Sequence, residues 1–228
     1  MTSVLSSLAE QFGDIDIYVF DQLLRGRITA EMTVLDAGCG TGRNLVYLLR
    51  SGYDVLGVDE DPAAVDAVRR LADEVAPRIA RENFRVERIE AMTFPDAAAD
   101  VVLSSAVLHF ARDEQHFWAM LHGMWRVLRP GGMLFCRLAS TIGMEGRFRH
   151  IAGRRFELLD GAERFLVDEP MLTDATARLG GELLDPIKTS VVQNLRCMTT
   201  WVVRKREGER VRGAATHSAS PDEPNRTA

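Results

Sequence analysis

A glycine-rich loop near the start of the chain constrains the fold most strongly. An apolar run, Thr33–Asp36, leads into alternating glycines at Gly38, Gly40 and Gly42, and Asn44–Arg50 is predicted as a helix. Glycines permit a tight turn and let a ligand approach the backbone closely. The start of the following helix would offer N–H groups and a positive dipole end to that ligand. The segment therefore predicts a cofactor site between a buried strand and a helix.

The same alternation of strand and helix continues along the chain. Short apolar or alternating runs predict further strands, and helices are predicted after the cap Asp61–Pro62 and over 113–128 and 170–179. The predicted strands are 55–58, 84–89, 101–103, 133–138, 183–187 and 199–204. Short apolar strands that alternate with helices indicate an α/β fold with a mostly parallel sheet covered on both faces.

The chain divides into three predicted parts. Residues 1–32 form an N-terminal helical segment, in which the spacing of Ile17, Phe20 and Leu24 predicts a helix ending near Gly26. Residues 33–204 form the main domain, with an insertion near 143–168 predicted as a loop or short hairpin. Residues 205–228 are polar and are expected to be a disordered tail.

Composition excludes several classes of protein. The 228 residues carry a formal net charge of -5, which weighs against a nucleic-acid binder that would rest on basic phosphate contacts. The three cysteines include no CxxC pair, and His116 and His122 share no helix face, so no metal site is predicted. The N-terminus lacks the features of a signal peptide, and no apolar stretch is long enough for a membrane span. We expect a cytoplasmic protein without membrane contact, and the sequence leaves its oligomeric state open.

The glycine loop does not match the dinucleotide fingerprint G-x-G-x-x-G. That pattern would need glycine at position 43 or, in the alternative register, at position 45, where the chain has Arg43 and Leu45. A nicotinamide cofactor is therefore disfavoured. An acid, Asp59, ends the second predicted strand 21 residues after Gly38. Dinucleotide folds share such an acid, so it does not discriminate between cofactors.

Five segments together resemble the motifs of class I S-adenosylmethionine-dependent methyltransferases. The loop reads D-x-G-x-G-x-G from Asp36, and Asp59 resembles the acid of the second motif. These segments are joined by Ile89–Pro95, by Asp100–Ser105 and by the turn Leu128–Gly132, in family order. Glu90 stands where the family usually has Asp, which keeps a carboxylate on a longer stem.

The resemblance implies a Rossmann-like, seven-stranded fold with an antiparallel last strand and S-adenosyl-L-methionine as the cofactor. It implies that the loop contacts the methionine part, that Asp59 accepts from the ribose hydroxyls and that Ala91 offers a backbone N–H. It also implies that residues 1–32 cover the site as a lid, while a surface helix stays the alternative. The expected cofactor-binding residues are Asp36, Gly38, Cys39, Gly40, Gly42, Asp59, Glu60, Glu90, Ala91 and Ser104.

Two residues near the expected active-site mouth are candidates for catalysis. His109 follows the fourth strand and is either a general base or a structural histidine at the strand exit. Arg137 lies on an otherwise apolar strand, where it would either form an internal salt bridge or meet an anionic substrate.

The expected function is methyl transfer to a small-molecule acceptor by in-line displacement. The stretch Ser104–His109 resembles that of ubiquinone-biosynthesis-type and tellurite-resistance-type methyltransferases. Two alternatives stay open: an RNA or protein methyltransferase that uses the arginines at 147, 149, 154 and 155, and a non-catalytic nucleotide-binding module or nucleotide-dependent oxidoreductase.

Overall fold

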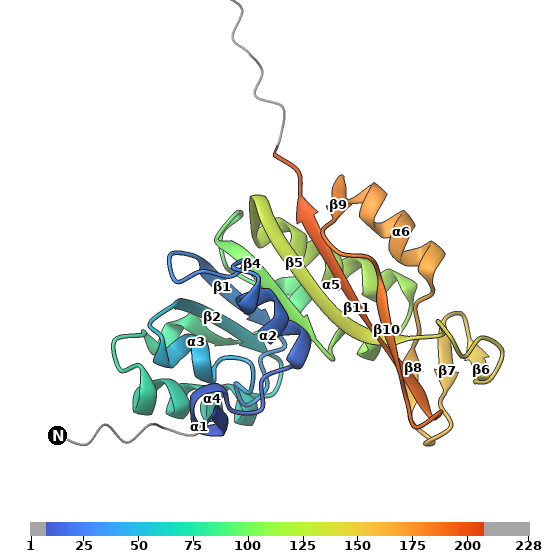
Figure 1. The fold of residues 1–228 in the computed structure, drawn as a ribbon, viewed down its shortest axis with the longest axis horizontal. Coiled ribbons are helices and arrows are strands. Elements are labelled where there is room, and N and C mark those ends of the chain that lie inside the picture. The colour runs from blue at the N-terminus through green and yellow to red at the C-terminus, as the bar shows by residue number, and fades with distance from the viewer. Residues whose placement is uncertain (1–7, 208–228) are drawn as a thin grey trace, which may run out of the picture.

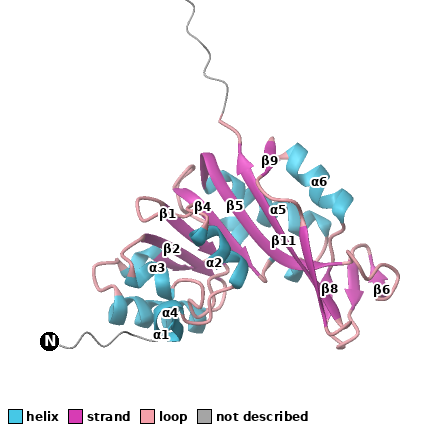
Figure 2. Cartoon of the chain, in the orientation of Figure 1, coloured by secondary structure: helices cyan, strands magenta, loops and turns pink. Residues whose placement is uncertain are grey.

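A twisted eight-stranded sheet forms the centre of the computed structural model, which describes residues 8–207 (Figures 1 and 2). Its strands are β1 (Thr33–Ala37), β2 (Asp54–Asp59), β3 (Phe84–Val86), β4 (Ala99–Ser105), β5 (Leu128–Ser140), β9 (Gly181–Leu183), β10 (Lys188–Val192) and β11 (Arg196–Lys205). The order is β10-β11-β5-β4-β1-β2-β3, with β9 also paired to β11. Strands β1 to β5 are parallel and β11 is antiparallel to β5, which confirms the predicted fold class and the reversed last strand.

The sheet has one strand more than predicted because its outer edge is interrupted. Both β9 and β10 pair with β11 on the side away from β5, and residues 184–187 separate them. Pro186 lies in this gap and has no N–H to donate to a ladder. The strand predicted over 183–187 is therefore wrong in its position, since the observed strands flank that segment.

Helices cover both faces of the sheet. They are α1 (Leu8–Phe12), α2 (Ile17–Leu24), α3 (Val46–Arg50), α4 (Pro62–Val75), α5 (Glu114–Val127) and α6 (Glu169–Arg178), with short 3-10 helices η1 (Arg81–Asn83), η2 (Ile89–Ala91) and η3 (Leu108–Phe110). Consecutive strand residues point to opposite faces. Val34 packs in the cluster under α2, α3 and α4, whereas Leu35 packs in the cluster under α5 and α6.

Several predicted boundaries shift. Strand β3 ends at Val86 rather than at residue 89, because the chain turns into η2. Helix α3 begins at Val46 rather than at Asn44. Asp61 caps α4 through its side chain, with Pro62 at the first position, as predicted.

The segment between β5 and α6 folds as a separate small sheet. Strands β6 (Arg149–Ala152), β7 (Arg155–Glu157) and β8 (Glu163–Phe165) are antiparallel and pack over a third apolar cluster that includes Phe148, Leu166 and Met198. The sheet replaces the loop or hairpin expected there, and it lies beside the carboxyl end of β5 (Figure 1).

Two predictions concern the ends of the chain. Residues 1–7 and 208–228 lie outside the described residues, so most of the predicted tail is not described. Lys205, its first predicted residue, ends β11, and its Nζ donates to the carbonyls of Trp125 and Leu128. Among the helices within 8–207, none combines the length and apolar character needed to cross a membrane.

Candidate cofactor site and an adjoining cavity

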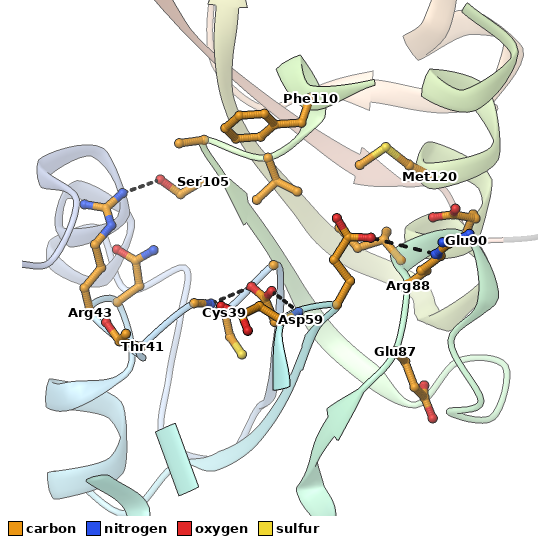
Figure 3. A pocket seen from close by; sticks show the side chains of 18 of the residues that line it. Cys39, Thr41, Arg43, Asp59, Glu87, Arg88, Glu90, Ser105, Phe110 and Met120 are labelled. Carbon is orange, nitrogen blue, oxygen red and sulfur yellow. Dashed lines mark hydrogen bonds and ion pairs between the residues drawn. The ribbon is translucent and has the colours of Figure 1, made fainter. Parts of the chain in front are cut away.

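The larger cavity, of about 550 Å³, opens at the carboxyl ends of β1, β2 and β4 (Figure 3). It is lined by Gly38, Cys39, Gly40, Thr41, Arg43, Asn44, Asp59, Glu60, Asp61, Glu87, Arg88, Ile89, Glu90, Ser105, Ala106, Val107, Phe110, His116 and Met120. Six of the ten predicted cofactor residues lie in this lining. Asp36, Gly42, Ala91 and Ser104 do not.

Glycine is required at position 38 by a close approach across the cavity floor. Gly38 has a φ of 86°, and a Cβ there would lie 2.4 Å from Cγ2 of Val107. Any side chain would therefore collide with Val107 at the exit of β4. Gly42 serves a different purpose from the predicted one, because a Cβ there would lie 2.8 Å from Val68 of α4. It packs the loop against a helix rather than facing the cavity.

The loop contributes shape rather than free donors. The amides of Gly38 and Cys39 both donate to the carbonyl of Val58, and the amide of Gly40 donates to Asp59 Oδ2 at 2.9 Å. These N–H groups are thus already paired within the protein. The sequence predicted free N–H groups at the start of the following helix, and the amides of these three loop residues are not among them, because β2 accepts their hydrogen bonds. The glycine loop therefore forms part of the cavity wall, and β2 supplies the acidic side chain of Asp59.

Asp59 is fixed in place at the end of β2. Its two carboxylate oxygens accept from the backbone N–H groups of Gly40 and Asp61, at 2.9 and 3.0 Å. A carboxylate has about four lone-pair sites, so two such bonds orient it and leave acceptor capacity. Because Asp59 also lines the cavity, that capacity is available to hydroxyl groups of a ligand.

Glu90 is held by a histidine. His116 Nδ1 accepts the backbone N–H of Arg112 at 3.2 Å, which places the ring proton on Nε2, and Nε2 lies 3.2 Å from Glu90 Oε1. The neighbouring Ala91 donates its own N–H to the carbonyl of Arg88. The expected backbone contact of Ala91 is therefore already used inside η2.

Asp36 is fully buried beneath the loop. Neither of its oxygens accepts a well-formed hydrogen bond within residues 8–207. Burial raises the pKa of Asp36 to about 7, and the charge of Asp59 adds to this, while Arg43 and Asn44 act in the opposite direction. The Asp36 carboxyl group therefore lies below the cavity without a full partner, and it does not line the cavity.

Three more predicted cofactor residues lie at the edge of the site or inside the sheet. Glu60 is exposed at the cavity rim, 3.8 Å from Arg88. Burial raises the pKa of the Cys39 thiol, so this lining residue is an inert thiol and not a nucleophile. Ser104 is fully buried in β4, and Ser105, one residue later, reaches the cavity instead because side chains alternate along a strand.

Asp16 links the N-terminal segment to the floor of the cavity. It caps α2, and its Oδ2 accepts from Ser105 at 3.1 Å and from Arg137 at 3.2 Å. Its backbone N–H donates to Asn44, and Arg43 donates to Ser105 at 2.9 Å. The side chain of Asp16 is 1% exposed, so this cluster is a buried polar connection between α2, the glycine loop, β4 and β5.

A second cavity, of about 290 Å³, adjoins the first and shares Ala106 with it. Both predicted catalytic residues, His109 and Arg137, line this second cavity and not the first. His109 Nδ1 accepts the backbone N–H of Ala139 at 3.2 Å. Burial lowers the pKa of His109 to about 4, and the charges of Arg164 and Arg196 add to this effect. The ring is therefore neutral near pH 7, with its proton on Nε2, and it cannot accept a proton at its bonded Nδ1.

Several residues at these cavities were missed from the sequence. Arg43 directly follows the glycine loop and Asp16 lies outside the motifs, and only the fold brings both to Ser105. The position of His116 near the cavity could have been predicted, since it lies in the first turn of a helix that begins after the fourth strand. Phe110 is a large apolar residue with 58% exposure at the cavity mouth (Figure 3).

This fold is Rossmann-like, and its larger cavity lies at the carboxyl ends of parallel strands, where proteins of this fold bind nucleotide cofactors. Residues 35–136 match the family model described as a methyltransferase domain. The segment from β1 to β5 is therefore similar to the methyltransferase domain, and this match covers less than half of the chain.

Curated relatives and solved structures agree with this family. The chain is 37% identical over 105 residues to the uncharacterized methyltransferase YodH of Bacillus subtilis, covering 46% of this chain and 42% of that protein. It is 33% identical over 104 residues to a ubiquinone biosynthesis O-methyltransferase of Methylocella silvestris, covering 46% and 38%. These matches thus span about two fifths of each relative. A methyltransferase structure from Methanosarcina mazei shares the fold, with a TM-score of 0.66 at 19% identity over 82% of this chain and 98% of that one.

Proposed function

We propose that this protein transfers a methyl group from S-adenosylmethionine to a small-molecule acceptor. The observation that carries the proposal is the pairing of Gly38 and Asp59 across one cavity. Gly38 lets Val107 pack directly against the loop, where a Cβ would collide with it, and Asp59 presents an oriented carboxylate from the neighbouring strand. An apolar floor beside a fixed acceptor of hydrogen bonds suits a cofactor with an aliphatic chain and a ribose.

Each end of the cavity has residues that fit one part of the cofactor. Asp59 would accept from the ribose hydroxyls, and Glu90, held by His116, would accept from the base. Asp36 would stabilise the positive charge of the cofactor from below the loop, since it is a buried carboxyl without a full partner. When bound, the cofactor supplies an electrophilic methyl group on a sulfonium.

The protein contributes mainly orientation to this reaction. Methyl transfer is an in-line displacement, and holding two reactants in line can lower a barrier by roughly 7–11 kcal/mol. The cavity shared at Ala106 would place an acceptor beside the cofactor site. His109 would act as a hydrogen-bond donor and not as a general base, which was one of the two roles that the sequence left open, because its Nδ1 lone pair is occupied. An acceptor that is already a good nucleophile needs no such base.

The arginine-rich sheet does not favour an RNA acceptor. Of the four arginines considered for nucleic-acid binding, Arg149 pairs with Glu157, Arg154 with Asp168 and Arg155 with Glu163. These pairs reduce the net positive charge that the small sheet could offer to the many phosphates of a nucleic-acid backbone. This pattern supports the small-molecule acceptor.

Calorimetry with S-adenosylhomocysteine tests the cofactor site. We expect micromolar binding that is lost in Gly40→Arg, whose side chain would project from the lining, and weakened at least tenfold in Asp59→Asn. Asp54→Asn is the matched control, because Asp54 is an exposed acid at the opposite end of the same strand. Equal affinity of Asp59→Asn and Asp54→Asn would contradict the site assignment.

Transfer itself requires a separate measurement. A screen with labelled S-adenosylmethionine against small-molecule extracts and against RNA reports the acceptor class. We expect label in the small-molecule fraction. Label in RNA alone would overturn the small-molecule proposal, and cofactor binding without any transfer would favour a non-catalytic module.

A further inference from the structure

The second cavity carries a concentration of positive charge that the cofactor does not need. Its polar lining consists of Arg137, Arg164, Arg196, His109 and one acid, Asp160. The remaining lining is apolar or small: Ala106, Ala139, Leu158, Ala162, Val192 and Met198. The chain has a formal net charge of -5, so this positive cluster is a local feature of the cavity.

Internal partners neutralise only part of this charge. Arg137 pairs with Asp16, and Arg196 pairs with Asp160 at 3.2 Å. For Arg164, no carboxylate within the described chain forms an ion pair; its Nη1 donates to the backbone carbonyl of Glu163 and its guanidinium lies over the Phe110 ring at 4.7 Å. The Nε of Arg137 is buried and has no hydrogen-bond partner among the described residues.

The two cavities lie on either side of the short helix η3. In η3, His109 lines the second cavity and Phe110 lines the cofactor cavity, although the residues are consecutive. Because Arg164 contacts Phe110, the basic cavity lies directly beside the wall of the cofactor site. A ligand in the second cavity would thus lie next to the cofactor.

We infer that the second cavity binds the methyl acceptor, and that the acceptor is a small molecule with an apolar body and one carboxylate or phosphate group. Arg164 and Arg196 would bind the anionic group at the cavity mouth, and His109 would donate to it from Nε2. Guanidinium groups form strong, charge-assisted hydrogen bonds with both kinds of anion. The lowered pKa of His109, caused by burial and by the two arginines, agrees with a positive potential in this cavity. This inference rests on the proposed methyl transfer.

Anion titration of the protein loaded with S-adenosylhomocysteine tests the inference. The probes are inorganic phosphate and benzoate, at equal ionic strength and followed by calorimetry. We expect saturable binding of at least one probe, and the tighter probe identifies the anion class. The double variant Arg164→Gln/Arg196→Gln should weaken that binding at least tenfold.

A matched double variant controls for the loss of two positive charges. Arg178 lies over the Trp118 ring as Arg164 lies over Phe110, and Arg204 pairs with Glu182 as Arg196 pairs with Asp160. Arg178→Gln/Arg204→Gln should bind the probe as the unchanged protein does. The inference is overturned if neither probe saturates, if the cavity variant binds normally, or if both double variants lose binding equally.

Cofactor binding separates this inference from the proposed function. The cavity variant should bind S-adenosylhomocysteine with unchanged affinity, because neither arginine lines the larger cavity. If the unchanged protein fails to bind S-adenosylhomocysteine, the proposed function fails, while the anion titration can be repeated without it and still reports on the second cavity.

Discussion

Arg137 donates from Nη1 to Asp16 Oδ2 at 3.2 Å, and this ion pair joins β5 to the N-cap residue of α2. The same oxygen accepts from Ser105. Ser105 lines the cofactor cavity and Arg137 lines the second cavity, so one buried carboxylate supports both. The N-terminal segment is therefore attached at the point where the two cavities meet.

Replacing Asp16 with Asn should loosen this attachment. The amide oxygen can still cap α2, but the negative charge that pairs with Arg137 is lost. Hydrogen bonds to charged groups contribute about 1.5–3 kcal/mol, so we expect the free energy of unfolding to fall by about 2–3 kcal/mol. Urea unfolding measures this loss, and hydrogen exchange of the amides of α2 should become faster.

Asp21→Asn provides the comparison on the same helix. Asp21 forms an exposed pair with Arg25 at 2.8 Å, and such surface pairs contribute about 0–1 kcal/mol. We expect Asp21→Asn to leave the exchange of α2 unchanged. A loss of stability that is the same in both variants would show that Asp16 is an ordinary surface acid in solution.

Asp36 should make the cofactor-free protein less stable as the pH rises. Its pKa is about 7 when folded and near 3.8 when unfolded, so the folded state binds the extra proton between these values. Stability is therefore lost from about pH 4 to pH 7 and is constant above that. The ceiling is about 4 kcal/mol, because one pKa unit corresponds to about 1.4 kcal/mol.

Comparison with Asp36→Asn isolates this contribution. The difference in unfolding free energy between the two proteins, measured in urea from pH 4 to pH 8, should change in favour of the variant and level off near pH 7. Asp54→Asn removes an exposed acid from the neighbouring strand and should show no such trend. Parallel pH curves for the protein and Asp36→Asn would contradict the raised pKa.

The central sheet and the cofactor cavity were predictable because they depend on local patterns. The run Val34–Gly42 and the acid Asp59 lie on adjacent strands, and the parallel pairing of β1 with β2 brings them together. Placing Asp59 beside the glycine loop required only the order of the strands. By contrast, Ala91 was expected to offer its backbone N–H, and only the structure shows that the carbonyl of Arg88 accepts this group.

The second cavity was not predictable because its residues converge from distant parts of the chain. Arg164 comes from β8 and Arg196 from β11, and neither is near a motif. The sequence left two roles open for Arg137, an internal salt bridge or an anionic substrate. The structure shows the salt bridge, with Asp16, and also places Arg137 in the cavity lining.

His109 should affect stability in the direction opposite to Asp36. Its pKa is about 4 when folded and near 6.5 when unfolded, so the unfolded chain binds the extra proton. Stability is therefore complete above about pH 6.5 and is lost as the pH falls towards 4, by at most about 3 kcal/mol. His109→Gln should remove this loss in urea unfolding, whereas His150→Gln, at an exposed histidine of β6, should retain it. If His109→Gln loses as much stability at low pH as the unchanged protein, the His109 ring is exposed to solvent in the folded state.

Replacing Gly123 with Ala should weaken cofactor binding from outside the cavity. Gly123 lies in the middle of α5, and a Cβ there would approach the carbonyl oxygen of Ile89 to 2.3 Å. The added methyl must displace η2, which carries Glu90, and overpacking of this kind costs about 1–3 kcal/mol. Calorimetry with S-adenosylhomocysteine should show affinity reduced about tenfold in the folded variant. His122→Ala, at the adjacent exposed position, should bind normally, and normal binding by both variants would show that Glu90 does not contact the cofactor.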